Sequence, residues 1–200
     1  MDGELEFREL DEHHWPAAQR LIAGAFLDEP FVLGMFGDSH LDRFLGLLDL
    51  HAQWPSAPGE VVLGAWRNGV LLAVGTVTLP GSCAHCDRWV DEVTDESGPS
   101  DLDLEFRRGV RAGHLAAHLP EHAHITTVAS EAALRGGGIG AALMTEICRR
   151  LGADGPVTVV LECYATRGRF YEQFGFRRIG EVPEAAVPGL MVALMRADIG

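Results

Sequence analysis

The feature of this sequence that most constrains its fold is a glycine-dense segment between two apolar runs. Residues 124–130 (His-Ile-Thr-Thr-Val-Ala-Ser) have the β-branched composition of a strand. Residues 136–140 read Gly-Gly-Gly-Ile-Gly, and residues 141–148 have the apolar character of a helix. Glycine is unfavourable inside a helix, but at a helix start it lets the backbone approach a ligand closely. The order strand, glycine turn and helix therefore predicts a helix N-terminus that faces a ligand.

A ligand at this position is expected to be an anion. The first N–H groups of a helix have no partner within the helix, and the helix dipole adds partial positive charge there. A phosphate or pyrophosphate satisfies both features. The segment between the strand and the helix is therefore interpreted as a phosphate-binding loop.

One class of phosphate-binding loop is the dinucleotide fingerprint, which Gly136-x-Gly138-x-x-Ala141 fits formally. That fingerprint requires a tight junction between the strand and the first glycine. Here about five residues separate Ser130 from Gly136, and more than a hundred residues precede the strand. A Rossmann-type nucleotide-binding enzyme is therefore an alternative, but a less favoured one.

Length and charge limit the other possibilities. Two hundred residues suffice for a single domain spanning 1–200, with an irregular acidic insertion at about 80–100. The net charge of −13 argues against nucleic acid as a partner. Residues 1–134 contain 8 Arg and 22 acidic residues, whereas residues 135–200 contain 8 Arg and 7 acidic residues. The second part is thus better suited to an anionic ligand.

Two further features bear on location and cysteine chemistry. The chain has no run of about 20 apolar residues, and its acidic N-terminus lacks the apolar segment of a signal peptide, so no membrane partner and a cytoplasmic location are expected.

Cys83-x-x-Cys86 has the spacing of a zinc knuckle, but no second pair completes it. We expect a polar loop and no metal there, since partners would have to come from histidines that only the fold could bring close: His114, His118, His122 and His124.

The remaining patterns predict an alternation of strands and helices. Asp11 is predicted to cap the first helix, and Asn68-Gly69 predicts a two-residue hairpin turn. The expected strands are 5–10, 61–66, 70–79, 124–130, 157–163, 176–181 and 190–196. The expected helices are 12–27, 38–53, 101–119, 141–151 and 167–174. The sequence Asp28-Glu29-Pro30 is expected to end the first of them.

Two motifs in register resemble those of a known family. Arg135-x-x-Gly138-x-Gly140 resembles the acyl-CoA pyrophosphate loop of the GNAT N-acetyltransferases. Residues 170–176 (Phe-Tyr-Glu-Gln-Phe-Gly-Phe) resemble the family's Tyr-Glu-x-x-Gly-Phe segment, and Tyr171 lies 36 residues after Arg135. The long segment between the third and fourth strands is similar to that of puromycin N-acetyltransferase-like members. The resemblance implies an α/β (α+β) GNAT fold. Its central sheet would be mixed, mostly antiparallel and of six to seven strands, with splayed strands 4 and 5 and about four or five flanking helices.

The resemblance also implies an activity: acetyl transfer from acetyl-CoA, as co-substrate, to the primary amine of a small molecule. The amine would attack the thioester directly and form a tetrahedral intermediate. Backbone groups of the fourth strand would bind the pantetheine arm and face the thioester oxygen, and the loop would bind the pyrophosphate. The implied cofactor-binding residues are Val128, Ala129, Ser130, Arg135, Gly136, Gly137, Gly138, Ile139, Gly140 and Ala141. A homodimer is possible, because dimers are common in the family.

Proton transfer is assigned by the same resemblance. Tyr171 stands where the family places the general acid that protonates the leaving thiolate. His124 stands where several members carry a catalytic Glu and serotonin N-acetyltransferase carries a His, and imidazole has a suitable intrinsic pKa for a base. His122, Glu162 and water remain alternative bases. A catalytically idle CoA-binding module is the other functional alternative, which an intact Tyr171 disfavours.

Two departures from the family pattern affect the expected contacts. The usual Val-x-Pro after the fourth strand is replaced by Ser130-Glu131-Ala132, and the Asn that bonds the pantetheine is replaced by Tyr164.

The sequence leaves the identity of the acceptor amine open. An acidic pocket with aromatic residues would suit an aromatic or cationic amine, and its candidate residues are Trp15, Phe31, Phe36, Trp54 and Trp89.

Overall fold

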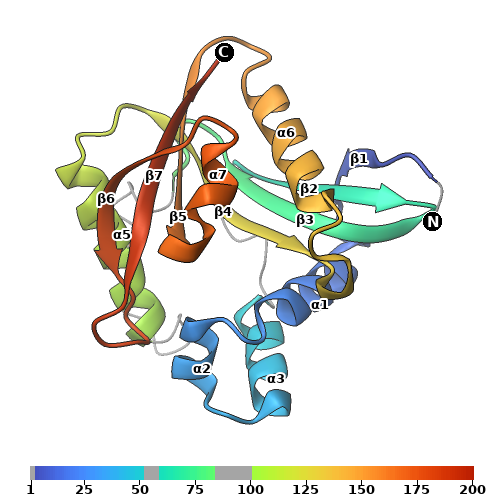
Figure 1. Cartoon of the computed structure of the whole chain (residues 1–200), viewed down its shortest axis with the longest axis horizontal. Helices are drawn as coiled ribbons and strands as arrows, with labels where there is room; N and C mark the ends of the chain where they lie inside the picture. The colour runs from blue at the N-terminus through green and yellow to red at the C-terminus, as the bar shows by residue number, and fades with distance from the viewer. Residues whose placement is uncertain (1–2, 52–58, 84–100) are drawn as a thin grey trace.

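Seven strands form one mixed sheet in the order β1-β2-β3-β4-β5-β7-β6. The computed structural model describes residues 3–51, 59–83 and 101–200 (Figure 1). Neighbouring strands are antiparallel except for the central pair, β4 and β5, which is parallel. The strands are β1 (Glu6–Glu9), β2 (Glu60–Arg67), β3 (Val70–Thr78), β4 (His122–Ser130), β5 (Val157–Tyr164), β6 (Arg177–Pro183) and β7 (Met191–Ile199).

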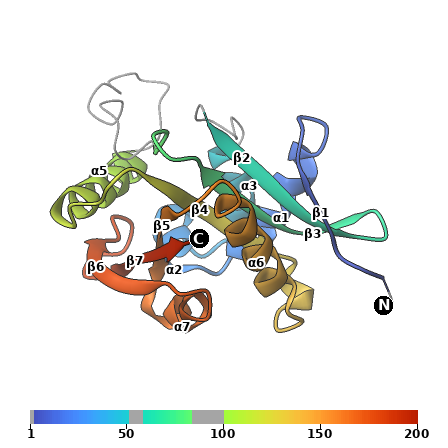
Figure 2. The same cartoon turned by 90° about the horizontal axis from the view of Figure 1, so that it is seen from above.

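Helices cover both faces of this sheet (Figures 1 and 2). None in the described ranges is long and apolar enough to cross a bilayer. Two single 3₁₀ turns, η1 (Ala132–Leu134) and η2 (Ala165–Arg167), follow β4 and β5. The α-helices are α1 (Trp15–Phe26), α2 (Pro30–Phe36), α3 (His40–Leu50), α5 (Asp101–Ala116), α6 (Ile139–Leu151) and α7 (Gly168–Glu172).

The alternation of side chains along β4 shows how the two faces differ. Ala123 and Ile125 belong to the main core, where they join Leu143 and Ile147 of α6. Successive side chains of a strand point to opposite faces. His122 and His124 therefore point to the other face, which α1 and α5 cover. This second face therefore carries buried polar side chains, among them His122 and His124.

The parallel pair β4–β5 separates soon after it begins. Residue pairing runs only from His122 with Thr158 to His124 with Val160. Beyond it, β4 continues to Ser130 and β5 to Tyr164, and the two strands diverge (Figure 1). In the second half of β4, the backbone N–H and C=O groups that face β5 therefore have no strand to pair with. Such groups need other hydrogen-bond partners. The predicted splayed strands and the predicted fold class are confirmed.

Local signals predicted the hairpin correctly but missed one helix. Asn68 and Gly69 have φ values of 51° and 76°, the positive pair that a type I′ turn requires. Pro30 was expected to follow the end of a helix, yet it starts α2, where its missing N–H costs nothing. With α2, the described residues contain six α-helices rather than four or five.

The predicted cap of the first helix is wrong. The N-cap of α1 is His14, and no side chain caps it. Asp11 instead accepts a hydrogen bond from the His13 amide at 3.0 Å and lies 2.8 Å from His14 Nδ1. Asp11 therefore stabilises the turn that precedes the helix.

Candidate functional site

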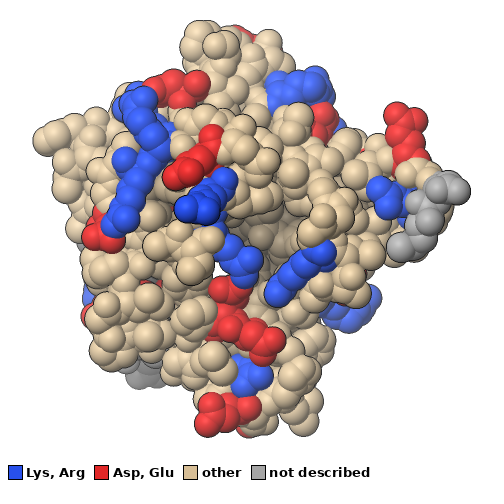
Figure 3. All heavy atoms as spheres, viewed as in Figure 1, with Lys and Arg blue, Asp and Glu red and all other residues tan. Residues whose placement is uncertain are grey.

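A cavity of about 650 Å³ lies where β4 and β5 diverge. It is lined by β4, the loop before α6, β5, the η2–α7 segment and parts of α1 and α2. On the face shown in Figure 3 the surface is hollowed near its centre, and both arginine and acidic side chains lie around the hollow. The divergence of the two central strands thus creates a candidate site.

The glycine-dense loop forms one end of the cavity. Gly136 and Gly138 have φ values of 82° and 78°, which favour glycine, and Gly138 is the N-cap of α6. The amides of the first helical turn, at Ile139, Gly140 and Ala141, have no acceptor within their own helix, and these residues line the cavity. This end of the site can therefore donate several N–H groups to an anion.

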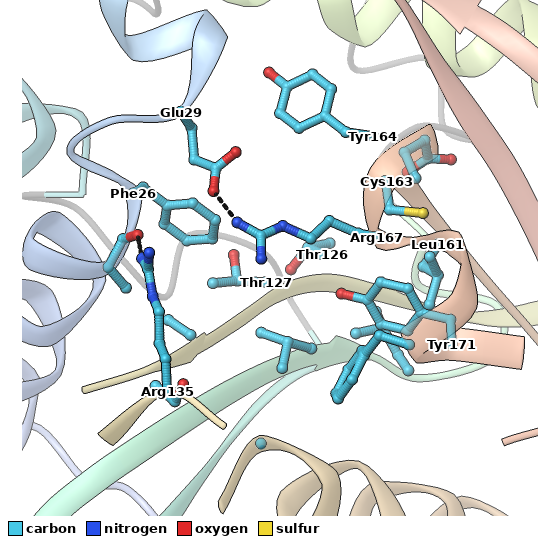
Figure 4. A pocket seen from close by; sticks show the side chains of 18 of the residues that line it. Phe26, Glu29, Thr126, Thr127, Arg135, Leu161, Cys163, Tyr164, Arg167 and Tyr171 are labelled. Carbon is cyan, nitrogen blue, oxygen red and sulfur yellow. Dashed lines mark hydrogen bonds and ion pairs between the residues drawn. The ribbon is translucent and has the colours of Figure 1, made fainter. Parts of the chain in front are cut away.

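Gly137 and Arg135 behave differently from the rest of the loop. The Gly137 amide donates to the Leu134 carbonyl at 3.0 Å, and this residue is not part of the cavity wall. Arg135 lines the cavity, and its Nη2 donates to the Ala25 carbonyl in the last turn of α1 at 2.5 Å (Figure 4). A cation is favourable at a helix C-terminus. In the described structure Arg135 therefore ties the loop to α1.

The unpaired half of β4 forms a second wall. Val128, Ala129 and Ser130 line the cavity and pair with β3 on their other side. A strand edge of this kind can accept a ligand that carries its own amide groups, as an added strand would. The structure thus brings the strand residues predicted from the sequence together with the loop residues.

Tyr171, on α7, extends its side chain to the cavity, and its hydroxyl points into it (Figure 4). The ring packs edge-on against Phe170 and Phe176, with centroid distances of 5.0 and 6.1 Å. Burial raises the pKa of this phenol above its ordinary value. Among the described residues the hydroxyl has no hydrogen-bond partner, so Tyr171 offers a protonated donor to whatever occupies the cavity.

A buried carboxylate with two imidazoles lies at the base of the divergence. Glu162 of β5 lines the cavity and accepts hydrogen bonds from His124 Nε2 at 2.7 Å and His114 Nε2 at 2.9 Å. Burial opposes ionisation of this carboxyl, but the two imidazoles outweigh it and hold the pKa of Glu162 below its usual range. Glu162 is therefore an anion in contact with the cavity.

The predicted base, His124, and its two side-chain alternatives, His122 and Glu162, occupy different places. The side chain of His124 is only 1% exposed and lies behind Glu162, outside the cavity wall. His122 also lies outside that wall and bonds the Pro120 carbonyl through Nδ1 at 2.8 Å. Of these three residues, Glu162 alone can contact a ligand in the cavity.

The far end of the cavity is formed by residues that the sequence patterns did not identify. Glu29, from the junction of α1 and α2, pairs with Arg167 of η2 at 2.8 Å (Figure 4). Glu184, which follows β6, accepts a hydrogen bond from the Tyr164 hydroxyl at 3.3 Å, and burial raises its pKa. Both glutamates lie in irregular junctions, where periodicity gives no signal; the Asp-Glu-Pro break at 28–30 was the one available clue to Glu29.

Tyr164 lines the cavity, together with one of the aromatic residues that were expected to form an acceptor pocket. The Tyr164 hydroxyl accepts a hydrogen bond from the Phe31 amide at 3.2 Å, so this residue joins β5 to the start of α2. Phe31 lines the cavity, whereas Trp15 and Phe36 do not. Trp54, Trp89 and most of the expected insertion at 80–100 lie outside the described residues.

Comparison with known proteins agrees with this geometry. Residues 104–198 match the family model of the acetyltransferase (GNAT) domain. No curated protein is similar enough to count as a match.

Solved structures resemble the chain over nearly its whole length. One from Corynebacterium glutamicum, described as histone acetyltransferase HPA2 and related acetyltransferase, is 19% identical with a TM-score of 0.65, covering 100% of this chain and 98% of that one. The polyamine N-acetyltransferase of Drosophila melanogaster, which forms N-acetylagmatine, is 16% identical with a TM-score of 0.66, covering 98% and 99%. The PaiA N-acetyltransferase of Thermoplasma acidophilum, in complex with coenzyme A, is 12% identical with a TM-score of 0.55, covering 97% and 98%. At these identities the likeness is one of fold.

Proposed function

We propose that this chain, which belongs to the GNAT superfamily of N-acetyltransferases, transfers the acetyl group of acetyl-CoA to the primary amine of a small cationic molecule. One observation carries the proposal. A single cavity is lined by the N-terminus of α6, by the side chain of Tyr171 and by the carboxylates of Glu29, Glu162 and Glu184. An anionic acyl donor and a cationic acceptor would meet in such a cavity at a proton donor.

The donor end fits acetyl-CoA by its chemistry. Amides of the first turn of α6 would bind the pyrophosphate, and the left-handed Gly138 lets the backbone turn toward it. The amides of the pantetheine arm would pair with the free edge of β4, at Val128 and Ser130. The thioester oxygen would then face a backbone N–H of the same free edge, near Val128, which would stabilise negative charge as it develops.

Transfer would proceed by direct attack. The amine nitrogen forms a bond to the thioester carbonyl carbon, and the resulting tetrahedral intermediate breaks its C–S bond. Tyr171 donates its proton to the sulfur that leaves. Its raised pKa keeps the phenol protonated, and the thiolate is the base that takes the proton.

Glu162 is proposed to hold the attacking amine. Its carboxylate can accept an N–H hydrogen bond from the amine, and the nitrogen becomes strongly acidic once it has attacked the carbonyl. A weakly basic carboxylate is then sufficient to take that proton. His124 and His114, which bond both oxygens of Glu162, fix the orientation of the carboxylate.

The charge of the acceptor end favours a cation. Glu29, Glu162 and Glu184 line the cavity: Glu29 pairs with Arg167, Glu162 bonds the imidazoles of His114 and His124, and Glu184 accepts a hydrogen bond from Tyr164. A polyamine or a guanidine-bearing amine would offer these carboxylates a further cationic partner. The solved Drosophila structure of similar fold comes from an enzyme that forms N-acetylagmatine, which supports testing this class first.

The test is a free-thiol assay with acetyl-CoA and a panel of amines: agmatine, spermidine, an aromatic amine and an amino acid. We expect acetyl-CoA-dependent thiol release that is fastest with agmatine or spermidine. Thermal melting with acetyl-CoA, CoA and NADH should show stabilisation by the CoA pair alone, growing with concentration. Stabilisation without release of thiol from any amine would indicate an idle CoA-binding module, and stabilisation by NADH alone would contradict the family assignment.

A further inference from the structure

Three potential metal ligands from separate elements meet outside the cavity, on the face of the sheet covered by α5. Cys83 follows β3, His114 lies in α5 and His122 begins β4; they are 5%, 2% and 3% exposed. Their ligand atoms all lie within 4.8 Å of one another. Cys83 Sγ is 4.0 Å from His114 Nδ1. We call these three residues the Cys83 cluster.

The second nitrogen of each histidine is oriented by a hydrogen bond. His114 Nε2 bonds Glu162 Oε1 at 2.9 Å, and His122 Nδ1 bonds the Pro120 carbonyl at 2.8 Å. Metal-ligating histidines nearly always donate their other N–H to a carboxylate or backbone carbonyl in this way. With those protons placed, the lone pair of His114 is on Nδ1, the atom nearest Cys83, and that of His122 is on Nε2.

We propose that the Cys83 cluster binds a divalent transition-metal ion, with Zn²⁺ as the preferred ion. One thiolate and two imidazoles are a donor set that suits zinc and disfavours magnesium or calcium. Tetrahedral Zn²⁺ places sulfur and nitrogen ligands about 3.6 Å apart. The sulfur–nitrogen distance of 4.0 Å therefore needs to shorten by only a few tenths of an ångström on binding.

Within the described residues, a hollow lies beside the cluster. A hollow of about 590 Å³, separate from the main cavity, is lined by all three members of the cluster. Such a hollow can admit a metal and leave room for a water ligand, the arrangement of three protein ligands and one open position. Among the described residues that line it, Glu121 favours a cation and Arg111 opposes one.

The position of the cluster indicates what an ion would do. Its ligands come from the loop after β3, from α5 and from the start of β4, so one ion would fix α5 to the sheet. It would also hold the imidazole of His114, whose other nitrogen bonds Glu162. This second effect rests on the proposed function, whereas metal binding itself does not.

The rival interpretation is a buried thiol hydrogen-bonded to imidazoles without any ion. Cys83 Sγ lies 3.6 Å from His124 Nδ1 as well, which is compatible with such a network. The two interpretations differ in what the purified protein contains. They also differ in how the protein responds to added metal.

The decisive experiment measures metal stoichiometry and affinity on the full chain. The protein is stripped with a chelator and titrated with Zn²⁺ against a competing chromophoric chelator. It is also titrated with Co²⁺, whose absorption reports tetrahedral geometry and thiolate ligation. We expect one equivalent of metal, a thiolate-to-cobalt band, and a melting temperature that rises with Zn²⁺ concentration.

Variants separate the cluster from adventitious surface binding. Cys83→Ser and His122→Gln should each weaken binding at least about 100-fold, because removing a ligand costs no less than removing its supporting hydrogen bond. Cys148→Ser, in α6 on the opposite face, is the matched control and should bind as the native chain does. Near-stoichiometric binding that survives in both ligand variants, or the absence of binding to the native chain, would overturn the proposal. Loss of binding in folded His122→Gln supports it even if Cys83→Ser fails to fold.

Discussion

Glu162 Oε2 accepts a hydrogen bond from His124 Nε2 at 2.7 Å, and of these two side chains it is Glu162 that reaches the cavity. The residue that the sequence favoured as the base therefore does not line the cavity itself. The carboxylate of Glu162 lies between its imidazole and the cavity, where the proposed amine would bind. This arrangement distinguishes a residue that contacts the amine from one that positions it.

Replacing Glu162 by Gln should lower kcat/KM for the amine by roughly 100-fold or more, because the carboxylate that orients the amine and takes its proton is lost. The KM for acetyl-CoA should change little, since Glu162 lies away from the phosphate-binding loop. Steady-state thiol release over a range of both substrates gives these values. His124→Gln serves as the comparison: it should reduce the rate less, and an equal or larger loss in that variant would favour His124 as the base.

Tyr171→Phe should lower kcat by about 100-fold or more, with the dissociation constant for acetyl-CoA nearly unchanged, because a proton donor is lost without loss of ring packing. Turnover and calorimetric binding of CoA measure the two quantities. The chain has one other tyrosine, Tyr164, which is the natural control. Tyr164→Phe removes the hydrogen bonds to Phe31 and Glu184 and should affect the KM for the amine more than kcat. Unchanged turnover in Tyr171→Phe would remove this residue as the acid.

Gly138→Asp should abolish measurable binding of acetyl-CoA, since a carboxylate would stand where the pyrophosphate is expected. The substitution also forces a side chain onto a φ of 78°. Gly69→Asp controls for that backbone effect, because Gly69 has a φ of 76° in the β2–β3 hairpin and does not line the cavity. Affinity in the control should equal that of the native chain. Native affinity in Gly138→Asp would place the pyrophosphate elsewhere.

The pH dependence of kcat/KM should rise toward the pKa of the acceptor amine and should not fall again below about pH 10. The rise reflects the neutral amine that attacks. The absence of an earlier fall follows from Tyr171, which is needed in its protonated form and whose pKa lies above the ordinary value of about 10. Initial rates with a stable acceptor between about pH 6 and pH 9.5 test this. A decline beginning near pH 8 would contradict the assignment of Tyr171.

Local sequence signals were sufficient where local geometry decides the structure. The hairpin at Asn68-Gly69 and the loop at residues 136–140 each depend on residues that can adopt positive φ, and both were predicted. Helix α2 was missed because Pro30 was interpreted as following a helix end, although proline is equally suited to a helix start. The two proline positions look alike in a sequence without tertiary information.

Contacts between distant residues could not be predicted in the same way. Arg135 belongs to a recognisable motif, yet its hydrogen bond to the Ala25 carbonyl spans 110 residues of sequence. The Cys83 cluster depends on the packing of α5 against the sheet, and no periodicity relates its members. Side-chain chemistry marked these residues as candidates, but the fold decides which of them meet.

The early separation of β4 from β5 affects more than the shape of the cavity. Three residue pairs join the two halves of the sheet along this seam, so the backbone ladder is interrupted at the centre of the domain. A bound pantetheine arm would supply hydrogen-bond partners for the backbone groups of β4 that do not pair with β5. Binding of the acyl donor would then be coupled to stability. The free energy of unfolding should be highest while the donor is bound, and release of the product should weaken the contact between β4 and β5 again.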